Sequence, residues 1–206
     1  MQANSVCRRQ NRSFAFPNEV WKRGGQTRRQ NKGKLMEGYV HVYTGNGKGK
    51  TTAALGLAVR SAGAGLKVFI AQFIKNGDYS EIKALRRLSD FITVEQFGLG
   101  RFINGKPSPA DIEAVRSGLG KVKSVISSGE YSVVILDEAN IAVKYDIFSE
   151  QELLDIIGLK SENTELVITG RDASPNVIEK ADLVTEMKEL KHYFQKGVQA
   201  RVGIEK

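Results

Sequence analysis

Short apolar runs and amphipathic stretches alternate along most of this chain. The runs are rich in Val, Ile, Leu and Phe, as β-strands are, and they are continuously apolar, as expected of parallel strands covered on both faces. Between Ile112 and Ile126, apolar residues recur every three or four positions, which predicts an amphipathic helix. The predicted strands cover residues 39–43, 67–73, 91–97, 132–136, 165–169 and 183–187, and the predicted helices cover residues 53–59, 81–88, 110–126, 150–157 and 175–181.

This alternation predicts an α/β fold with a mostly parallel central sheet flanked by helices. Ligands of such open sheets bind beyond the carboxyl ends of the strands. The loops that follow the strands should therefore share one edge of the sheet and hold the functional residues.

A glycine-rich segment, residues 44–52, separates the first predicted strand from its helix. Its sequence, Thr-Gly-Asn-Gly-Lys-Gly-Lys-Thr-Thr, is typical of a phosphate-binding loop. Glycines let backbone N–H groups surround an anion, Lys50 adds a positive charge, and Thr51 offers a hydroxyl to Mg²⁺. The general pattern has glycine where this chain has Thr44, so a glycine-rich structural turn is the alternative. We favour the phosphate loop and expect a RecA-like P-loop nucleotide-binding fold.

Two acids, Asp137 and Glu138, directly follow the apolar run 132–136. A carboxylate in this place can hold Mg²⁺ opposite the phosphate loop, directly or through water. Adjacent side chains of an extended chain point to opposite sides, so we expect only one of the two to meet the metal directly.

Two arginines are further candidates. Arg171 follows the run 165–169 on the same edge and could bind phosphate, although a solvated side chain is the alternative. Arg60 lies nine residues beyond Thr51 on the loop helix, where the residues alone favour an exposed charge.

The positive charge of the chain is concentrated at its N-terminus. Residues 1–35 contain nine Lys or Arg and one acid, whereas residues 36–206 contain 22 bases and 22 acids. The folded part is therefore neutral, which removes the main argument for nucleic-acid binding. Residues 1–35 lack apolar periodicity and predict a flexible arm, an organelle-targeting peptide, or an extension upstream of a true start at Met36. Residues 36–206 suit a single domain.

Cysteine and histidine point to no metal or redox chemistry. Cys7 is the only cysteine, so one chain can form no internal disulfide, which fits a reducing cytoplasm. His41 and His192 lack partners at metal-ligand spacing and do not indicate a zinc site. We expect a cytoplasmic protein, since no apolar run approaches the roughly 20 residues that a membrane span needs.

Six segments together resemble the ATP:corrinoid adenosyltransferases of cobalamin synthesis and salvage. The resemblance spans residues 38–205, and Thr44 in place of glycine is the family's own form of the loop. The segments are residues 44–54, 68–75, 136–140, 168–171, 181–187 and 191–205.

The resemblance implies a definite reaction, in which a Co(I) corrinoid, cob(I)alamin or another, attacks the 5′ carbon of ATP and releases triphosphate. It implies that ATP lies reversed relative to ordinary phosphate-loop enzymes, with its ribose toward the corrin. The alternative from the loop and acids alone is a phosphate-loop ATPase or kinase. A nucleic-acid-binding module that uses the basic N-terminal segment is a second alternative.

The resemblance also assigns roles. Asn46 resembles the residue that contacts the ribose, Lys50 the phosphate-binding lysine, and Arg60 a family arginine near the nucleotide. Thr51, Asp137 and Glu138 resemble the ligands of Mg²⁺, or of Mn²⁺ in its place. The predicted nucleotide-binding residues are Thr44, Gly45, Asn46, Gly47, Lys48, Gly49, Lys50, Thr51, Thr52, Arg60 and Arg171.

One loop departs from the family. Some members carry a Phe-x-Trp segment whose aromatic rings help to strip the lower axial ligand from cobalt, but residues 97–106 contain no tryptophan. Phe102 is the candidate substitute, and packing in the core is its alternative role, so corrinoid preference stays open. The predicted catalytic residues are Lys50, Thr51 and Phe102.

The resemblance further implies a homodimer in which residues 1–35 could cover the partner's active site. A flavoprotein is the expected electron donor, and neither a membrane nor a nucleic acid is an expected partner.

Overall fold

The computed structural model describes residues 37–100 and 105–205, and in them six strands form one sheet. The strand order is β3-β2-β4-β5-β1-β6, and every neighbouring pair is parallel. This confirms the predicted α/β class, and each strand lies within one residue of its predicted bounds. The strands are β1 (Val40–Thr44), β2 (Val68–Phe73), β3 (Ile92–Phe97), β4 (Val133–Asp137), β5 (Glu165–Thr169) and β6 (Leu183–Glu186).

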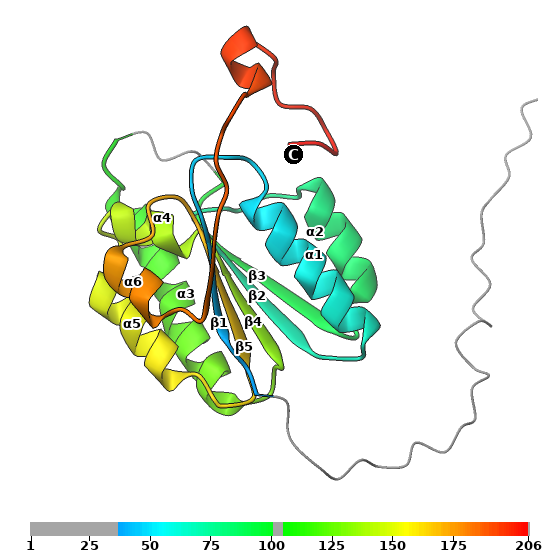
Figure 1. Ribbon diagram of the computed structural model, residues 1–206, viewed down its shortest axis with the longest axis vertical. Helices are drawn as coiled ribbons and strands as arrows, with labels where there is room; N and C mark the ends of the chain where they lie inside the picture. Colours follow the sequence, from blue (N-terminus) through cyan, green and yellow to red (C-terminus); the bar gives the residue numbers. More distant parts are fainter. Residues whose placement is uncertain (1–36, 101–104, 206) are drawn as a thin grey trace, which may run out of the picture. The chain divides into compact units, whose positions relative to one another are not determined.

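Helices cover both faces of the sheet (Figure 1). One face carries α1 (Lys50–Gly63) and α2 (Ser80–Leu85), and the other carries α3 (Pro109–Ser128), α4 (Ala139–Lys144), α5 (Glu150–Leu159) and α6 (Pro175–Lys180). Short 3-10 helices cover Arg86–Leu88 and Tyr193–Lys196.

Alternate residues of the central strands fill two separate cores. On β4, Val134 and Leu136 belong to the core under α3 to α6, whereas Val133 and Ile135 belong to the core under α1 and α2. Helix α1 meets the sheet through Ala54, Ala58 and Ala62. Because alanine side chains are short, the helix that follows the glycine-rich segment can lie close to the strands.

The strand order positions the candidate residues. Strand β5 lies between β1, which leads into the glycine-rich segment, and β4, which ends at Asp137. Because all three strands are parallel, their carboxyl ends share one edge, with Thr169 at the end of β5 between the two. The predicted convergence of these loops is confirmed.

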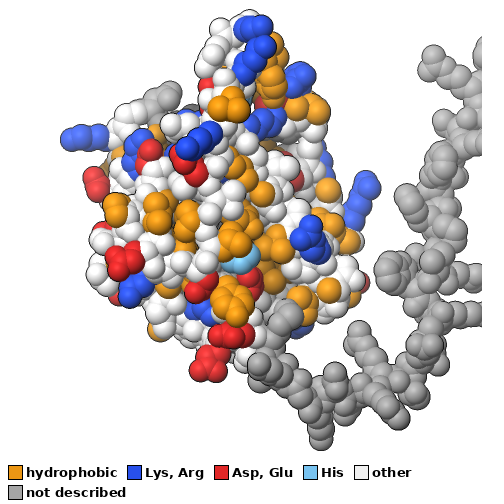
Figure 2. All heavy atoms as spheres, in the orientation of Figure 1, with side chains coloured by type: hydrophobic (Ala, Val, Ile, Leu, Met, Phe, Trp, Pro, Cys, Tyr) orange, Lys and Arg blue, Asp and Glu red, His pale blue; other side chains and the backbone are white. Residues whose placement is uncertain are grey.

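The edge strand β6 is exposed along its whole length. Hydrophobic side chains gather on the surface over β1 and β6 (Figure 2), and Tyr39, Leu183 and Val184 are each at least 41% exposed. None of the described helices is both long and apolar enough to cross a membrane. The N-terminal segment 1–35 and Phe102 lie outside the described residues.

Helix α3 packs against β3 through a glycine. A Cβ atom at Gly118 would fall well inside van der Waals distance of the Phe97 ring, whereas one at Gly120 would meet no atom of the described residues within 4 Å, apart from its own helix backbone. The absence of a side chain at Gly118 is therefore what allows the helix and strand to approach.

We predict that Gly118→Ala lowers the free energy of unfolding by about 1–3 kcal/mol, because the new methyl group overpacks the core against Phe97. Gly120→Ala, in the same helix, should instead raise it by about 0.5–1 kcal/mol, the usual gain of alanine over glycine in a helix. Urea denaturation of both variants measures the difference. Equal stabilisation by the two substitutions would contradict the close approach.

Candidate active site

The glycine-rich segment turns sharply between β1 and α1. Gly45 has φ 90° and Gly49, which precedes the first residue of α1, has φ 123°, values that side-chain-bearing residues rarely adopt. The N-cap residue of α1 is Gly49, which has no side chain to cap the helix, and the first turn holds no acid. The positive end of the helix is therefore available to an anion.

The segment also lies against the chain that leaves β6. The Gly47 N–H donates a 2.6 Å hydrogen bond to the carbonyl oxygen of Met187. A Cβ atom would lie 2.5 Å from that oxygen at Gly45 and 2.7 Å from it at Gly47. These two glycines are required by this backbone contact as well as by the turn.

Thr44, a predicted nucleotide-binding residue, has a structural contact of its own. Its side chain is buried, and its hydroxyl accepts a hydrogen bond from the Ala173 N–H at 3.2 Å. The hydroxyl thus ties β1 to the loop after β5, and this packing accounts for a side chain at the position where the general pattern has glycine.

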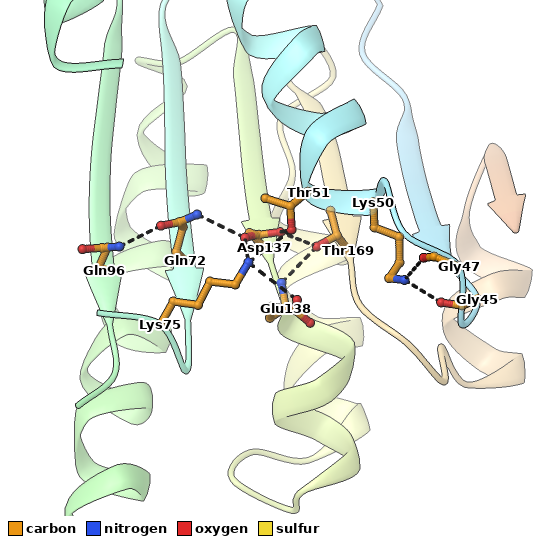
Figure 3. Close-up of polar contacts among 10 residues, drawn as sticks. All are labelled: Gly45, Gly47, Lys50, Thr51, Gln72, Lys75, Gln96, Asp137, Glu138 and Thr169. Atoms are coloured by element: carbon orange, nitrogen blue, oxygen red, sulfur yellow. Dashed lines mark hydrogen bonds and ion pairs between the residues drawn. The ribbon is translucent and has the colours of Figure 1, made fainter. Parts of the chain in front are cut away.

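Lys50 lies folded into the loop that precedes it. Its ammonium donates to the carbonyl oxygens of Gly45 at 2.6 Å and Gly47 at 2.8 Å (Figure 3). The residue is only 9% exposed, and burial lowers the pKa of Lys50. Loop and lysine together form a compact cationic cradle.

Asp137 is the most connected side chain of the site. It is fully buried, and it accepts hydrogen bonds from Thr51 at 2.8 Å and Thr169 at 2.7 Å through Oδ1. Through Oδ2 it accepts from Gln72 at 3.2 Å and from the Lys75 ammonium at 2.8 Å (Figure 3). These donors come from α1, β5, β2 and the loop after β2.

Glu138 corrects one expectation. The two acids do not diverge as neighbours in an extended chain would, because the strand ends at Asp137 and Glu138 takes a left-handed conformation with φ 61°. Its N–H donates to the Thr169 hydroxyl at 3.0 Å, and its Oε1 lies 3.6 Å from the Lys75 ammonium. Burial raises the pKa of Glu138, although the charge of Lys75 acts in the opposite direction.

These elements enclose a cavity of about 990 Å³. Nine predicted residues line it, and the tail that follows β6 supplies part of its wall. The predicted residues in the lining are Asn46, Gly47, Lys48, Gly49, Lys50, Thr51, Thr52, Glu138 and Arg171, and the tail contributes His192, Gly203, Ile204 and Glu205.

Arg60 is not part of this lining. It lies exposed in the last turn of α1, ten residues beyond Lys50, and a helix rises 1.5 Å per residue, which places it about 15 Å along the axis. The geometry of one chain thus gives no support to its predicted role beside the nucleotide.

Sequence reasoning missed two features of the cavity. The first is Lys75, which follows β2 at the edge formed by the carboxyl ends of the strands. Its position in the loop after a strand could have marked it as a candidate site residue. The second is a cluster around Lys48, whose ammonium contacts the Tyr193 hydroxyl at 3.0 Å and Glu205 at 2.8 Å. Hydrogen bonds from Arg201, Lys48 and Tyr193 hold the pKa of Glu205 well below its usual range. No local pattern predicts contacts across more than 140 residues.

Comparison with known proteins agrees with this geometry. The sequence model of the family described as ATP:corrinoid adenosyltransferase BtuR/CobO/CobP matches residues 36–205. The chain belongs to this family. It is 34% identical to a corrinoid adenosyltransferase of Pseudomonas aeruginosa over 82% of this chain and 83% of the relative. A Sinorhizobium corrinoid adenosyltransferase is 35% identical over 82% of this chain and 80% of the relative. The corrinoid adenosyltransferase CobA of Salmonella typhimurium is 31% identical over 82% of this chain and 85% of the relative.

In this family member, one hydroxyl links both acids of the site, because Thr169 donates to Asp137 and accepts from the Glu138 N–H. We predict that Thr169→Val lowers the free energy of unfolding by about 1–3 kcal/mol, since it leaves buried polar groups without that partner. Thr169→Ser keeps the hydroxyl, so its free energy of unfolding should fall much less. Urea denaturation compares the two, and equal losses would show that the hydroxyl is unimportant.

Proposed function

We propose that this chain transfers the 5′-deoxyadenosyl group of ATP to the Co(I) centre of a reduced corrinoid, cob(I)alamin or a related compound, and releases triphosphate. Its membership of the family over residues 36–205 is the observation that carries this proposal. The cobalt lone pair forms a bond to the ribose C5′, and the C5′–O bond breaks with its electron pair leaving on the triphosphate.

The cradle suits a departing polyanion. Lys48, Lys50 and Arg171 line the cavity, and the uncapped start of α1 faces it. Positive groups aimed at the oxygen on which charge develops stabilise the transition state more than the ground state. Since Co(I) is itself the nucleophile, the remaining task of the protein is alignment, which can contribute about 7–11 kcal/mol.

We propose Mg²⁺, or Mn²⁺, as the cation of this site, held by Thr51 and Glu138 with Asp137 behind them. The donors fit, because hydroxyl and carboxylate oxygens are the ligands of hard cations. Among the described residues, no three His, Cys, Asp or Glu side chains form a metal-binding group, so triphosphate oxygens and water would complete the shell. The bound cation would supply positive charge to the leaving group.

The cavity also has apolar lining that suits the corrinoid. Its lining includes the apolar and aromatic side chains Ile74, Tyr79, Ile141, Tyr145 and Ile204, which can cover a large flat ring system. Phe102 stays the predicted aid to removal of the lower axial ligand.

We also propose that the enzyme is a cytoplasmic homodimer that receives its reduced substrate with the help of a flavoprotein. The exposed apolar residues over β1 and β6 support a subunit interface. Residues 1–35 would cover the partner's cavity, and unchanged corrinoid affinity after their deletion would refute that role.

An anaerobic assay with ATP, Mg²⁺ and chemically reduced cobalamin tests the function. We expect a light-sensitive cobalt–carbon product together with triphosphate, whereas ADP formation independent of corrinoid would indicate an ATPase or kinase.

We predict that Lys50→Ala lowers kcat by about 10²-fold or more, because the triphosphate loses a buried positive charge as it departs. Lys67→Ala, which removes an exposed lysine paired with Glu130, should keep the wild-type rate. Initial rates of the anaerobic assay measure both, and an unimpaired Lys50→Ala variant would contradict the proposed cradle.

We predict that Thr51→Ala raises the Mg²⁺ concentration for half-maximal rate by about tenfold or more, as loss of a ligand or its support weakens metal binding. Thr51→Ser retains the hydroxyl and should stay close to wild type. A magnesium titration at saturating ATP gives the comparison, and coincident curves for all three proteins would remove Thr51 from the metal site.

A further inference from the structure

A lysine ammonium lies beside all three residues of the proposed metal site, which are the two proposed ligands Thr51 and Glu138 and the Asp137 carboxylate behind them. The Nζ atom of Lys75 is 3.2 Å from the Thr51 hydroxyl, 2.8 Å from Asp137 Oδ2 and 3.6 Å from Glu138 Oε1 (Figure 3). The ligands were predicted from the phosphate loop and the acids after β4, without reference to Lys75. Their convergence on one cation is an independent observation about the site.

The positive charge of Lys75 compensates the negative charge of the two acids. Asp137 is fully buried, and a buried carboxylate is costly unless it is paired and hydrogen-bonded. In the described part of the chain, both acids have their ion pair with Lys75. Burial opposes the charge of this lysine, but the attraction of Asp137 and Glu138 outweighs it and raises the pKa of Lys75.

The backbone before Lys75 is held in an unusual conformation. Ile74 has φ 65°, a left-handed value that is rare for a β-branched residue. Its N–H donates to the Phe97 carbonyl at 2.8 Å, and Gly98 leaves room for its backbone, since a Cβ there would lie 2.5 Å from the Ile74 carbonyl carbon. Strain of this kind persists where surrounding structure enforces it, and here it directs the next side chain to the acids.

We propose that Lys75 is a resident cation of the metal site, which a divalent cation displaces into the cavity when it arrives with triphosphate. The proposal rests on the metal site of the proposed function. Lys75 lines the cavity, its side chain is 26% exposed, and its flexible stem can turn toward bound phosphates. The metal and the Lys75 ammonium would contact the same side-chain oxygens, so only one of the two cations can occupy the site at a time.

This exchange couples the metal to the nucleotide. A divalent cation alone must displace Lys75 without offering the lysine another anion, so it binds weakly. With triphosphate present, the displaced ammonium gains a new anionic partner. The metal then binds more tightly than the extra phosphate oxygens in its coordination shell would explain by themselves. Lys75 thereby disfavours a metal-loaded site that holds no nucleotide.

The test measures Mn²⁺ binding by electron paramagnetic resonance, with and without inorganic tripolyphosphate and in the absence of corrinoid. In Lys75→Gln we expect Mn²⁺ alone to bind about tenfold more tightly than in wild type, with a smaller gain from tripolyphosphate. Lys75→Arg keeps a positive charge at this position, so its binding of Mn²⁺ without tripolyphosphate should stay as weak as that of the wild type. Lys83→Gln, which removes an exposed lysine near Asp78, should match wild type.

Thermal unfolding supplies a readout without nucleotide. Lys75→Gln should melt at a lower temperature than wild type in EDTA, and Mn²⁺ alone should restore it, because the metal replaces the missing positive charge. Should the variant be unfolded in EDTA, refolding on addition of Mn²⁺ supports the proposal, and failure to refold overturns it. Equal affinity of wild type and Lys75→Gln for Mn²⁺ alone would also overturn it.

Failure of the metal site itself gives a different result. In that case neither protein binds Mn²⁺, even with tripolyphosphate, which overturns both the resident-cation proposal and the metal ligands. Adenosyl transfer without resident-cation behaviour would leave the proposed function standing and refute only the role of Lys75.

Discussion

Burial of the Asp137 carboxylate is the constraint on which this site depends. A charge out of contact with water must have every oxygen satisfied, and the donors are Thr51, Gln72, Lys75 and Thr169. They come from both helix and sheet, so satisfying one side chain fixes the relative positions of α1, β2, β4 and β5 at the functional edge. The polar chain continues outward, since Gln96 of β3 donates to Gln72 at 2.9 Å. The same interactions thus stabilise the edge and shape the cavity.

The phosphate loop depends on a second backbone, that of the chain after β6. The carbonyl of Met187 lies so close to Gly45 and Gly47 that neither position could hold a side chain without movement. The Met187 N–H in turn donates to the Thr44 carbonyl at 2.8 Å, which continues the pairing of β6 with β1. Loop geometry is therefore set partly by an edge strand more than 130 residues away.

The fold was predictable because each central strand is a continuous apolar run and each long helix has a clear period. The six-residue helix α4 was not predicted separately. In the site, the loop and the acids were predicted from local patterns. Only the backbone conformation of Glu138 was wrongly predicted, because an extended-strand rule does not encode its left-handed φ. Lys75 and the tail contacts of Lys48 arise only when distant segments meet, so no local pattern could predict them.

The cradle described here is one that phosphoryl-transfer enzymes also use, and a fold alone does not define a reaction. What differs in adenosyl transfer is which bond of ATP breaks. When the attack falls on the ribose carbon, all three phosphates leave together, and the site must stabilise a whole triphosphate instead of a single transferred phosphoryl group. Lys48, Lys50 and Arg171 all line the cavity, and three positive charges suit that longer anion. Lys75, once released from the acids, would add a fourth positive charge at the moment when the leaving group needs it.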